Sequence, residues 1–121
     1  MNLLIIDDND DVAYLYSKLA KPYFTNIFTC DTCAKAEKTL KLHEMDAIIC
    51  DLNLGCVLGS DLLISLRHLI VNAKVYFISC SEHLQTHSDH AKSFGLNVVG
   101  CDQKPVDIKQ LVSIFKSCAS T

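Results

Sequence analysis

Five short apolar runs alternate with five segments of helical period along the whole chain. The strand-like runs are residues 2–6, 26–30, 46–50, 74–79 and 97–101. The helical segments are residues 10–21, 33–44, 60–71, 82–94 and 107–118. Within the third of these, one helical face carries Leu62, Leu63, Leu66, Leu69 and Ile70. This alternation predicts βαβ units and therefore an α/β fold, with a five-stranded parallel sheet covered by helices on both faces.

The composition fits one globular domain spanning residues 1–121. Hydrophobic residues make up 50% of the chain and charged residues 21%, which is typical of a folded protein. No apolar run approaches the ~20 residues that a membrane span needs. No basic segment precedes the first apolar run, so we expect no signal peptide and a cytoplasmic location. The net charge is −3 and lysines and arginines do not cluster, so we expect no direct contact with nucleic acid or membrane.

Three aspartates follow two of the apolar runs. Asp7 and Asp8 follow residues 2–6, and Asp51 follows residues 46–50. Because ligands of open parallel sheets bind at the carboxyl ends of the strands, we expect these carboxylates to meet. Carboxylates this close repel one another and need protons or a divalent cation, here Mg²⁺. We predict that Asp8 and Asp51 are direct ligands. Asp7 would act through water, and the backbone carbonyl of Asn53 would add a ligand.

Two further polar residues are placed to complete a site for phosphoryl chemistry. Ser79 ends the run 74–79, and Lys104 stands directly before Pro105. A carboxylate can attack phosphorus and form an aspartyl phosphate, and Asp51 is the candidate nucleophile. The Lys104 ammonium would stabilise the charge of the transferring group, and the Ser79 hydroxyl would donate a hydrogen bond to it. Each signal alone is weak, but together they favour phosphoryl transfer.

The motifs resemble those of the receiver domains of bacterial response regulators, over essentially all 121 residues. LLIIDDND is similar to the first strand of that family with its acidic pair, and AIICDLNLGCVLGSDLL to its phosphoacceptor strand and loop, with Gly59 at the usual distance. VYFISCS places Ser79 at the usual hydroxyl position, and QKP supplies the lysine.

The resemblance implies a flavodoxin-like, doubly wound sheet with strand order 2-1-3-4-5 and a cis Lys104–Pro105 bond. It implies a two-component signalling role: Mg²⁺-dependent transfer from a sensor histidine kinase or phosphotransfer protein to Asp51, followed by slow self-hydrolysis rather than enzymatic turnover. Output would pass to a downstream protein, an output domain or a second copy. The surface used would be that formed by residues 82–94, 97–101 and 107–118.

Two positions depart from the family pattern, and the spacing of a third differs. Leu54-Gly55 replaces the usual Met-Pro pair after the phosphoacceptor, which indicates a more flexible loop. Cys101 occupies the position, three residues before the lysine, where the family carries Tyr or Phe. The stretch from Gly95 to Lys104 is also slightly longer than usual. A thiol cannot perform the inward movement of an aromatic ring, so we expect that the usual coupling between the Ser79 hydroxyl and an aromatic ring does not operate here.

Two alternative functions follow from these departures and from the aspartate chemistry. The first is a phosphorylation-independent interaction module with a receiver fold, which Cys101 and Leu54-Gly55 favour and the complete acidic set disfavours. The second is a phosphatase of the haloacid-dehalogenase type. That class requires an aspartate two residues after the nucleophile, and this chain has Asn53 there.

Cysteines and histidines form two further patterns. Cys30 and Cys33 have the C-x-x-C spacing of a redox dithiol or half a zinc site, but no second such pair accompanies them, so packing is the favoured interpretation. Cys56, Cys80 and Cys101 are expected near one edge of the sheet, where thiol oxidation would affect phosphorylation. The spacing of His83, His87 and His90 predicts one helical face. An exposed polar face or a partner interface is favoured there over metal binding or pH sensing.

Overall fold

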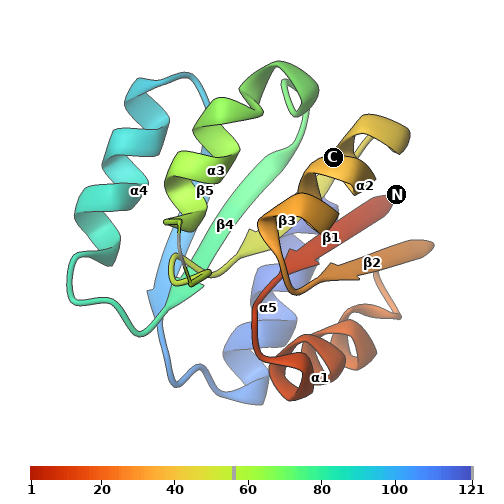
Figure 1. Ribbon diagram of the computed structural model, residues 1–121. Helices are drawn as coiled ribbons and strands as arrows, with labels where there is room; N and C mark the ends of the chain where they lie inside the picture. The colour runs from red at the N-terminus through yellow and green to blue at the C-terminus, as the bar shows by residue number, and fades with distance from the viewer. Residues whose placement is uncertain (56, 121) are drawn as a thin grey trace.

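The fold is a five-stranded parallel sheet between two layers of helices, in a computed structural model that describes residues 1–55 and 57–120 (Figure 1). The strand order is β2-β1-β3-β4-β5, and every strand pair is parallel. The strands are β1 (Asn2–Ile6), β2 (Asn26–Cys30), β3 (Ala47–Cys50), β4 (Lys74–Ser79) and β5 (Asn97–Gln103). The expected α/β class, the flavodoxin-like topology and the strand order are confirmed.

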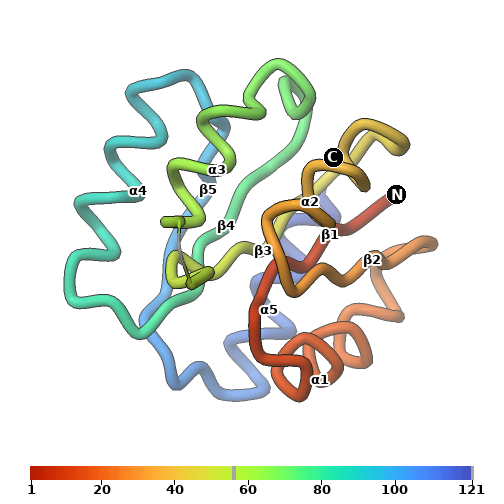
Figure 2. Tube along the Cα trace, in the orientation of Figure 1, coloured from red at the N-terminus to blue at the C-terminus, as the bar shows by residue number. Residues whose placement is uncertain are grey.

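Five α-helices cover the two faces of the sheet. They are α1 (Asp10–Ala20), α2 (Cys33–Leu42), α3 (Gly59–Ser65), α4 (Leu84–Ser93) and α5 (Ile108–Ala119). Helices α1 and α5 pack on one face, and α2, α3 and α4 on the other, as the backbone trace in Figure 2 shows. The order reversal at β1 puts β1 and β3 side by side in the centre, which is where ligands bind in folds of this topology.

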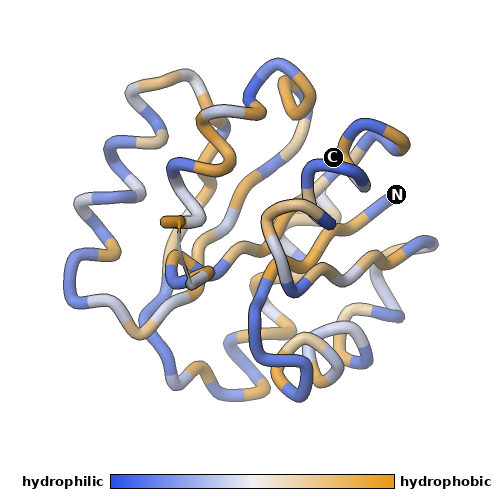
Figure 3. The backbone as a smooth tube through the Cα atoms, in the orientation of Figure 1, coloured by the Kyte–Doolittle hydropathy of each residue, from blue (hydrophilic) through white to orange (hydrophobic). Residues whose placement is uncertain are grey.

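Burial on both faces explains the uninterrupted apolar strands, which form the hydrophobic interior in Figure 3. In β1 the side chains of Leu4 and Ile6 enter the core shared with α2, α3 and α4. Those of Leu3 and Ile5 enter the core shared with α1 and α5. All four are fully buried, and each such burial contributes about 1.5–3 kcal/mol of hydrophobic free energy. A one-sided sheet would instead have required alternating polar residues.

The third helix is shorter than its sequence period predicts. The pattern indicates a helix over residues 60–71, but α3 ends at Ser65 and a 3₁₀ turn, η1, follows at Arg67–Leu69. Leu66 leaves the helical conformation with φ −105° and ψ 13°. Leu66 and Ile70 remain buried all the same. A 3₁₀ turn keeps residues three apart on one side, so the apolar spacing continues past the point where the α-helix ends.

Strand β5 contains one residue more than the matching part of β4. Val75 pairs with Val98, whereas Tyr76 pairs with Gly100, so Val99 forms a bulge. Beyond the bulge the pairing is regular up to Ser79 and Gln103. The additional residue in the Gly95–Lys104 stretch is thus absorbed before the strand reaches the site.

Gly59, the first residue of α3, lies against the backbone that carries Asp51. A Cβ atom at this position would lie 2.1 Å from the carbonyl oxygen of Asp51 and 2.7 Å from Sγ of Cys50. We predict that Gly59→Ala lowers the free energy of unfolding, measured by urea denaturation, by about 2–3 kcal/mol, because the backbone at Asp51 would have to move to make room for the methyl group. At an ordinary helical position the same change would raise stability.

Ser60→Ala is the matched control for this prediction. Ser60 is fully buried, and its hydroxyl has no hydrogen-bond partner within the described ranges. Removing this hydroxyl should leave stability unchanged or raise it, because no hydrogen bond is lost. Wild-type stability in Gly59→Ala would contradict the close approach to Asp51.

Candidate functional site

Two buried aspartates lie side by side at the carboxyl edge of the sheet. Ile6 pairs with Cys50 at the ends of β1 and β3, so the next residue of each strand, Asp7 and Asp51, is also a neighbour. Their exposed fractions are 2% and 7%, whereas Asp8 is exposed. One carboxylate oxygen from each of the three aspartates lies within 4.8 Å of the others. The structure therefore brings together the three carboxylates that the sequence predicts at one site.

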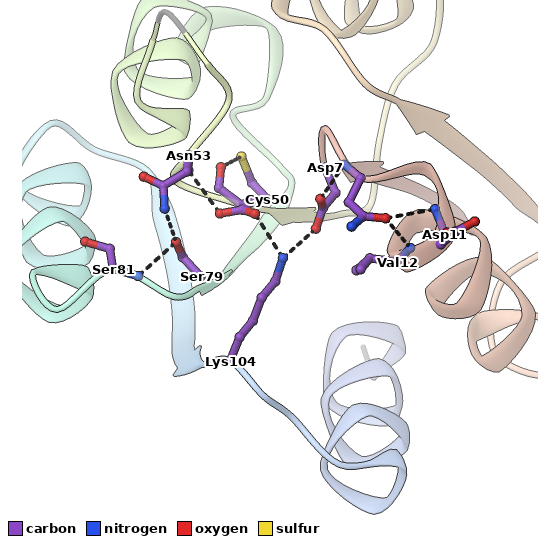
Figure 4. Close-up of polar contacts among 10 residues, drawn as sticks. Asp7, Asp11, Val12, Cys50, Asn53, Ser79, Ser81 and Lys104 are labelled. Atoms are coloured by element: carbon purple, nitrogen blue, oxygen red, sulfur yellow. Dashed lines mark hydrogen bonds and ion pairs between the residues drawn. The ribbon is translucent and has the colours of Figure 1, made fainter.

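Lys104 reaches this pair from the far side of β4. Its backbone N–H donates to the carbonyl of Ser79 at 2.9 Å, and the bond to Pro105 is cis. Its side chain, 16% exposed, extends toward Asp7 in Figure 4. The ammonium donates to Oδ2 of Asp7 and to Oδ2 of Asp51, at 2.9 Å each. One cation from β5 thus bridges the carboxylates that follow β1 and β3.

Burial and charge have opposite effects on these groups. Burial raises the pKa of Asp7, and the backbone N–H of Asn9 and the Lys104 ammonium only partly offset it. For Lys104, burial lowers the pKa, but the hydrogen bonds and charges of Asp7 and Asp51 outweigh it and keep the pKa above its ordinary value. The ammonium is therefore retained at neutral pH. Three carboxylates facing one ammonium leave excess negative charge, and oxygen ligands so grouped suit Mg²⁺.

Ser79 and Asn53 form the other side of the site. The Ser79 hydroxyl is fully buried and accepts hydrogen bonds from Nδ2 of Asn53 at 3.4 Å and from the backbone N–H of Ser81 at 3.3 Å. The backbone N–H of Asn53 donates to Oδ1 of Asp51 at 3.0 Å. The sequence reasoning used only the carbonyl of Asn53 and missed its side chain. Neither contact uses the hydroxyl hydrogen of Ser79, which can therefore point into the site.

Comparison with known proteins identifies the family. The family model described as the response regulator receiver domain matches residues 3–116. The chain belongs to the response regulator receiver family. Receiver domains are signalling domains, generally without enzymatic turnover, and typically bind Mg²⁺ at an acidic cluster such as that of Asp7, Asp8 and Asp51.

One curated relative is the cell cycle transcriptional regulator CtrA of Caulobacter vibrioides, 29% identical over 86 residues. The matched segment is 71% of this chain and 37% of CtrA, so the match spans little more than a third of the length of that relative.

Solved structures share the fold. A CheY-like receiver domain from Methanospirillum hungatei has a TM-score of 0.84 at 17% identity, over 98% of this chain and 92% of its own. A response regulator from Colwellia psychrerythraea has a TM-score of 0.80 at 24% identity, over 98% of this chain and 95% of its own. A response regulator from Burkholderia pseudomallei has a TM-score of 0.81 at 20% identity, over 98% of this chain and 68% of its own. Its crystal structure contains a phosphorylated aspartic acid, a calcium ion and citrate.

The two departures from the receiver pattern have local structural counterparts. Leu54 is buried, its N–H donates to the carbonyl of Val57 at 3.4 Å, and Gly55 supplies the positive φ of 84° for the turn. Cys101 is half-buried and packs against the core beneath α4, where its thiol contacts Oε1 of Gln85 at 3.5 Å. At the aromatic position of the receiver family, this chain therefore has a thiol in contact with α4.

Among the described residues, the histidine and cysteine patterns form no group of possible metal ligands. His87 and His90 belong to α4, and His83 is its N-cap residue, whose carbonyl accepts a hydrogen bond from the N–H of His87 at 3.1 Å. The loop after β4 continues to His83, whose N–H donates to the Ser81 hydroxyl. Cys30 is buried and contacts the hydroxyl of Thr39, which fits packing. Cys56 lies outside the described residues. Within 1–55 and 57–120, only the three aspartates group as possible metal ligands.

None of the helices within the described ranges is long and apolar enough to cross a membrane.

Replacing Lys104 tests the charge balance of the site. We predict that Lys104→Met lowers the free energy of unfolding by about 3 kcal/mol in EDTA, because two buried carboxylates lose their counter-charge. Saturating Mg²⁺ should raise the melting temperature of the variant more than that of the wild type, since it then relieves a larger repulsion. Thermal melts in EDTA and in Mg²⁺ measure both effects.

Lys35→Met is the control, because Lys35 pairs with Asp31 on the surface. An exposed pair adds little to stability, so this variant should melt like the wild type and respond equally to Mg²⁺. An identical response of Lys104→Met and Lys35→Met to Mg²⁺ would show that the ammonium does not balance the acidic site.

Proposed function

We propose that residues 1–121 form one cytoplasmic receiver domain of a two-component system, in which Asp51 accepts a phosphoryl group from a phosphohistidine. The donor is a sensor histidine kinase or a phosphotransfer protein. The observation that carries the proposal is the Lys104 ammonium bridging Asp7 and Asp51 at 2.9 Å, with the Ser79 hydroxyl beside them. A solvated turn or a helix cap would not require this set of contacts among four strands.

In the transfer step, a carboxylate oxygen of Asp51 forms a bond to phosphorus while the P–N bond of the donor breaks. The electron pair of that bond returns to the imidazole nitrogen. Oδ1 of Asp51 is oriented by the N–H of Asn53 and Oδ2 by Lys104, so the nucleophile is held in one rotamer. Asp7, Asp8 and Asp51, with the carbonyl of Asn53, would hold Mg²⁺, which would supply positive charge to the phosphoryl oxygens.

Lys104 and Ser79 stabilise the transferred group. Once Asp51 is phosphorylated, its carboxyl group carries less negative charge, and the Lys104 ammonium can follow the charge onto a phosphoryl oxygen. The Ser79 hydroxyl donates its free hydrogen to another oxygen. In turning toward that oxygen, the Ser79 side chain moves relative to the N–H of Ser81, which donates to it and lies in the loop leading to α4. Phosphorylation thereby acts on the α4–β5–α5 surface, through which we expect a downstream protein, an output domain or a second copy to bind.

Two comparisons support this proposal. The response regulator from Burkholderia pseudomallei, which shares the fold, carries a phosphorylated aspartic acid and a calcium ion in its crystal structure. The family match over residues 3–116 includes Asp7, Asp8, Asp51, Ser79 and Lys104.

An apolar groove beside the site is suited to the donor protein. It has a volume of about 360 Å³ and runs between α1 and the β5–α5 loop. Its walls include Leu15, Tyr16, Pro105 and Val106, and Lys104 lines its inner end. Leu15 is 46% exposed, so apolar surface remains uncovered there. A protein that brings a phosphohistidine to Asp51 has to cover this neighbouring surface.

A second candidate is the phosphorylation-independent interaction module. Cys101 favours it, because the thiol contacts Gln85 without any phosphoryl group and is too small to undergo the ring movement typical of the family. This candidate predicts that partner binding is the same for the wild type and for Asp51→Asn, with or without a phosphodonor.

Incubation with acetyl phosphate tests the proposed chemistry. We expect intact-mass spectrometry to show the addition of one phosphoryl group in Mg²⁺ and none in EDTA or in Asp51→Asn. Asp61→Asn is the control, because Asp61 is an exposed residue of α3. If wild-type protein gains no phosphoryl group from acetyl phosphate or from any histidine donor, the proposal is wrong and the second candidate stands.

Leu15→Asp tests the groove. A charge in the apolar wall should slow transfer from a phosphorylated histidine protein at least about tenfold, because the interface must then bury a carboxylate. Reaction with acetyl phosphate should be unchanged, since a small donor needs no groove. Leu42→Asp, a 67% exposed position on α2, should affect neither reaction. Equal slowing by both variants would contradict docking at the groove.

A further inference from the structure

A hollow between β5 and α5 has no role in the phosphoryl chemistry described above. It has a volume of about 320 Å³. Seven residues line it: Tyr76, Val99, Asp102, Gln110, Ser113, Ile114 and Ser117. Binding sites for small molecules occupy roughly 300–1,000 Å³, so this hollow lies at the lower end of that range and has room for a single long side chain. Its lining comes from β4, α5 and β5, the last of which is the edge strand of the sheet.

Asp102 gives the hollow its charge. One carboxylate oxygen, Oδ2, accepts a hydrogen bond from the hydroxyl of Tyr76, and no other hydrogen bond to this carboxylate occurs in the described part of the chain. Nor does any cationic group of the same part lie within ion-pair distance of it. Burial and the Asp102 carboxylate raise the pKa of Tyr76, so its hydroxyl stays protonated and keeps donating. Oδ1 of Asp102 is therefore fixed in position and available.

The bulge in β5 builds the hollow. A Cβ atom on Gly100 would lie 2.5 Å from Cε2 of Tyr76, so only glycine lets the ring lie against the strand. The extra residue, Val99, is 42% exposed at the rim, and Ile114 of α5 is buried at the base. The result is an apolar wall with one carboxylate and, from α5, exposed serine hydroxyls and the amide of Gln110.

We propose that this hollow binds the side chain of an arginine presented by a partner polypeptide. The aliphatic stem of arginine would lie along Val99 and Ile114, and the guanidinium would reach the Asp102 carboxylate and the hydroxyls of α5. Arginine suits the site better than lysine, because a planar group with five donors can satisfy a carboxylate and neutral oxygens at once. The assignment of this arginine to the downstream partner rests on the proposed function.

A tripeptide probe, acetyl-Ala-Arg-Ala-amide, tests the site by NMR titration of the full chain in saturating Mg²⁺. We expect shifts at Val99, Asp102 and Ser113, with a dissociation constant on the order of 1 mM, as befits one side chain. The same peptide with citrulline, which has the shape of arginine without its charge, should bind at least about fivefold more weakly. Equal binding of the two peptides, or shifts confined to Asp7, Asp8 and Asp51, would overturn the proposal.

Three variants sharpen the test. Asp102→Asn should weaken the arginine peptide about tenfold, with Tyr76 still able to donate to the amide oxygen. Ser113→Lys, at an exposed position on α5, should abolish binding by placing the chain's own cation in the hollow. Asp61→Asn should bind like the wild type. Unchanged binding in both Asp102→Asn and Ser113→Lys would overturn the proposal.

Further variants separate this proposal from the phosphorylation chemistry and from self-association. Asp51→Asn should bind the peptide normally, so failure of the phosphorylation chemistry and failure of this site are recorded separately. The chain contains a single arginine, Arg67, on the turn after α3. If the wild type self-associates in sedimentation and Arg67→Lys does not, the occupant is a second copy and the assignment to a different polypeptide is wrong.

Discussion

The closeness of Asp7 and Asp51 is the constraint on which the rest of this structure depends. The parallel pairing of β1 and β3 ends at Ile6 and Cys50, so the residues that follow cannot avoid one another. Both carboxylates are buried, and their repulsion has to be offset by positive charge. The charge that the chain itself provides is Lys104, which reaches across the end of β4 from β5. Any group that withdraws Lys104 from this pair must therefore disturb the contacts between the central strands and the edge of the sheet.

The parts of the fold that follow from burial were predictable from the sequence. Central strands covered on both faces are apolar along their length, so a run such as residues 47–50 can be recognised in the sequence. The site residues follow from the same reasoning, because parallel strands place Asp7, Asp51 and Ser79 at one edge. The exact extent of elements was less predictable. A 3₁₀ turn preserves the spacing of Leu66 and Ile70 while ending α3, and spacing alone does not reveal this.

Other features depend on register and on side-chain direction, which a single sequence does not contain. The bulge at Val99 changes which residues of β4 and β5 face each other, and only this change brings Tyr76 against Gly100. The contact of Asn53 with Ser79 crosses between β3 and β4, although the two residues are 26 positions apart. Each is decided by tertiary contacts rather than by local propensity.

The hollow and the acidic site share two strands. Tyr76 and Ser79 are both on β4, and Asp102, on β5, lies two residues before Lys104. Cys101 lies between Gly100 and Asp102 on β5, so β4 and β5 themselves connect the two sites. Coupling between two sites is reciprocal. If phosphorylation of Asp51 changes the affinity of the hollow for its occupant by a given factor, the occupant changes the phosphorylation equilibrium by the same factor. A partner bound at the hollow would then act on the lifetime of the signal as well as receive it.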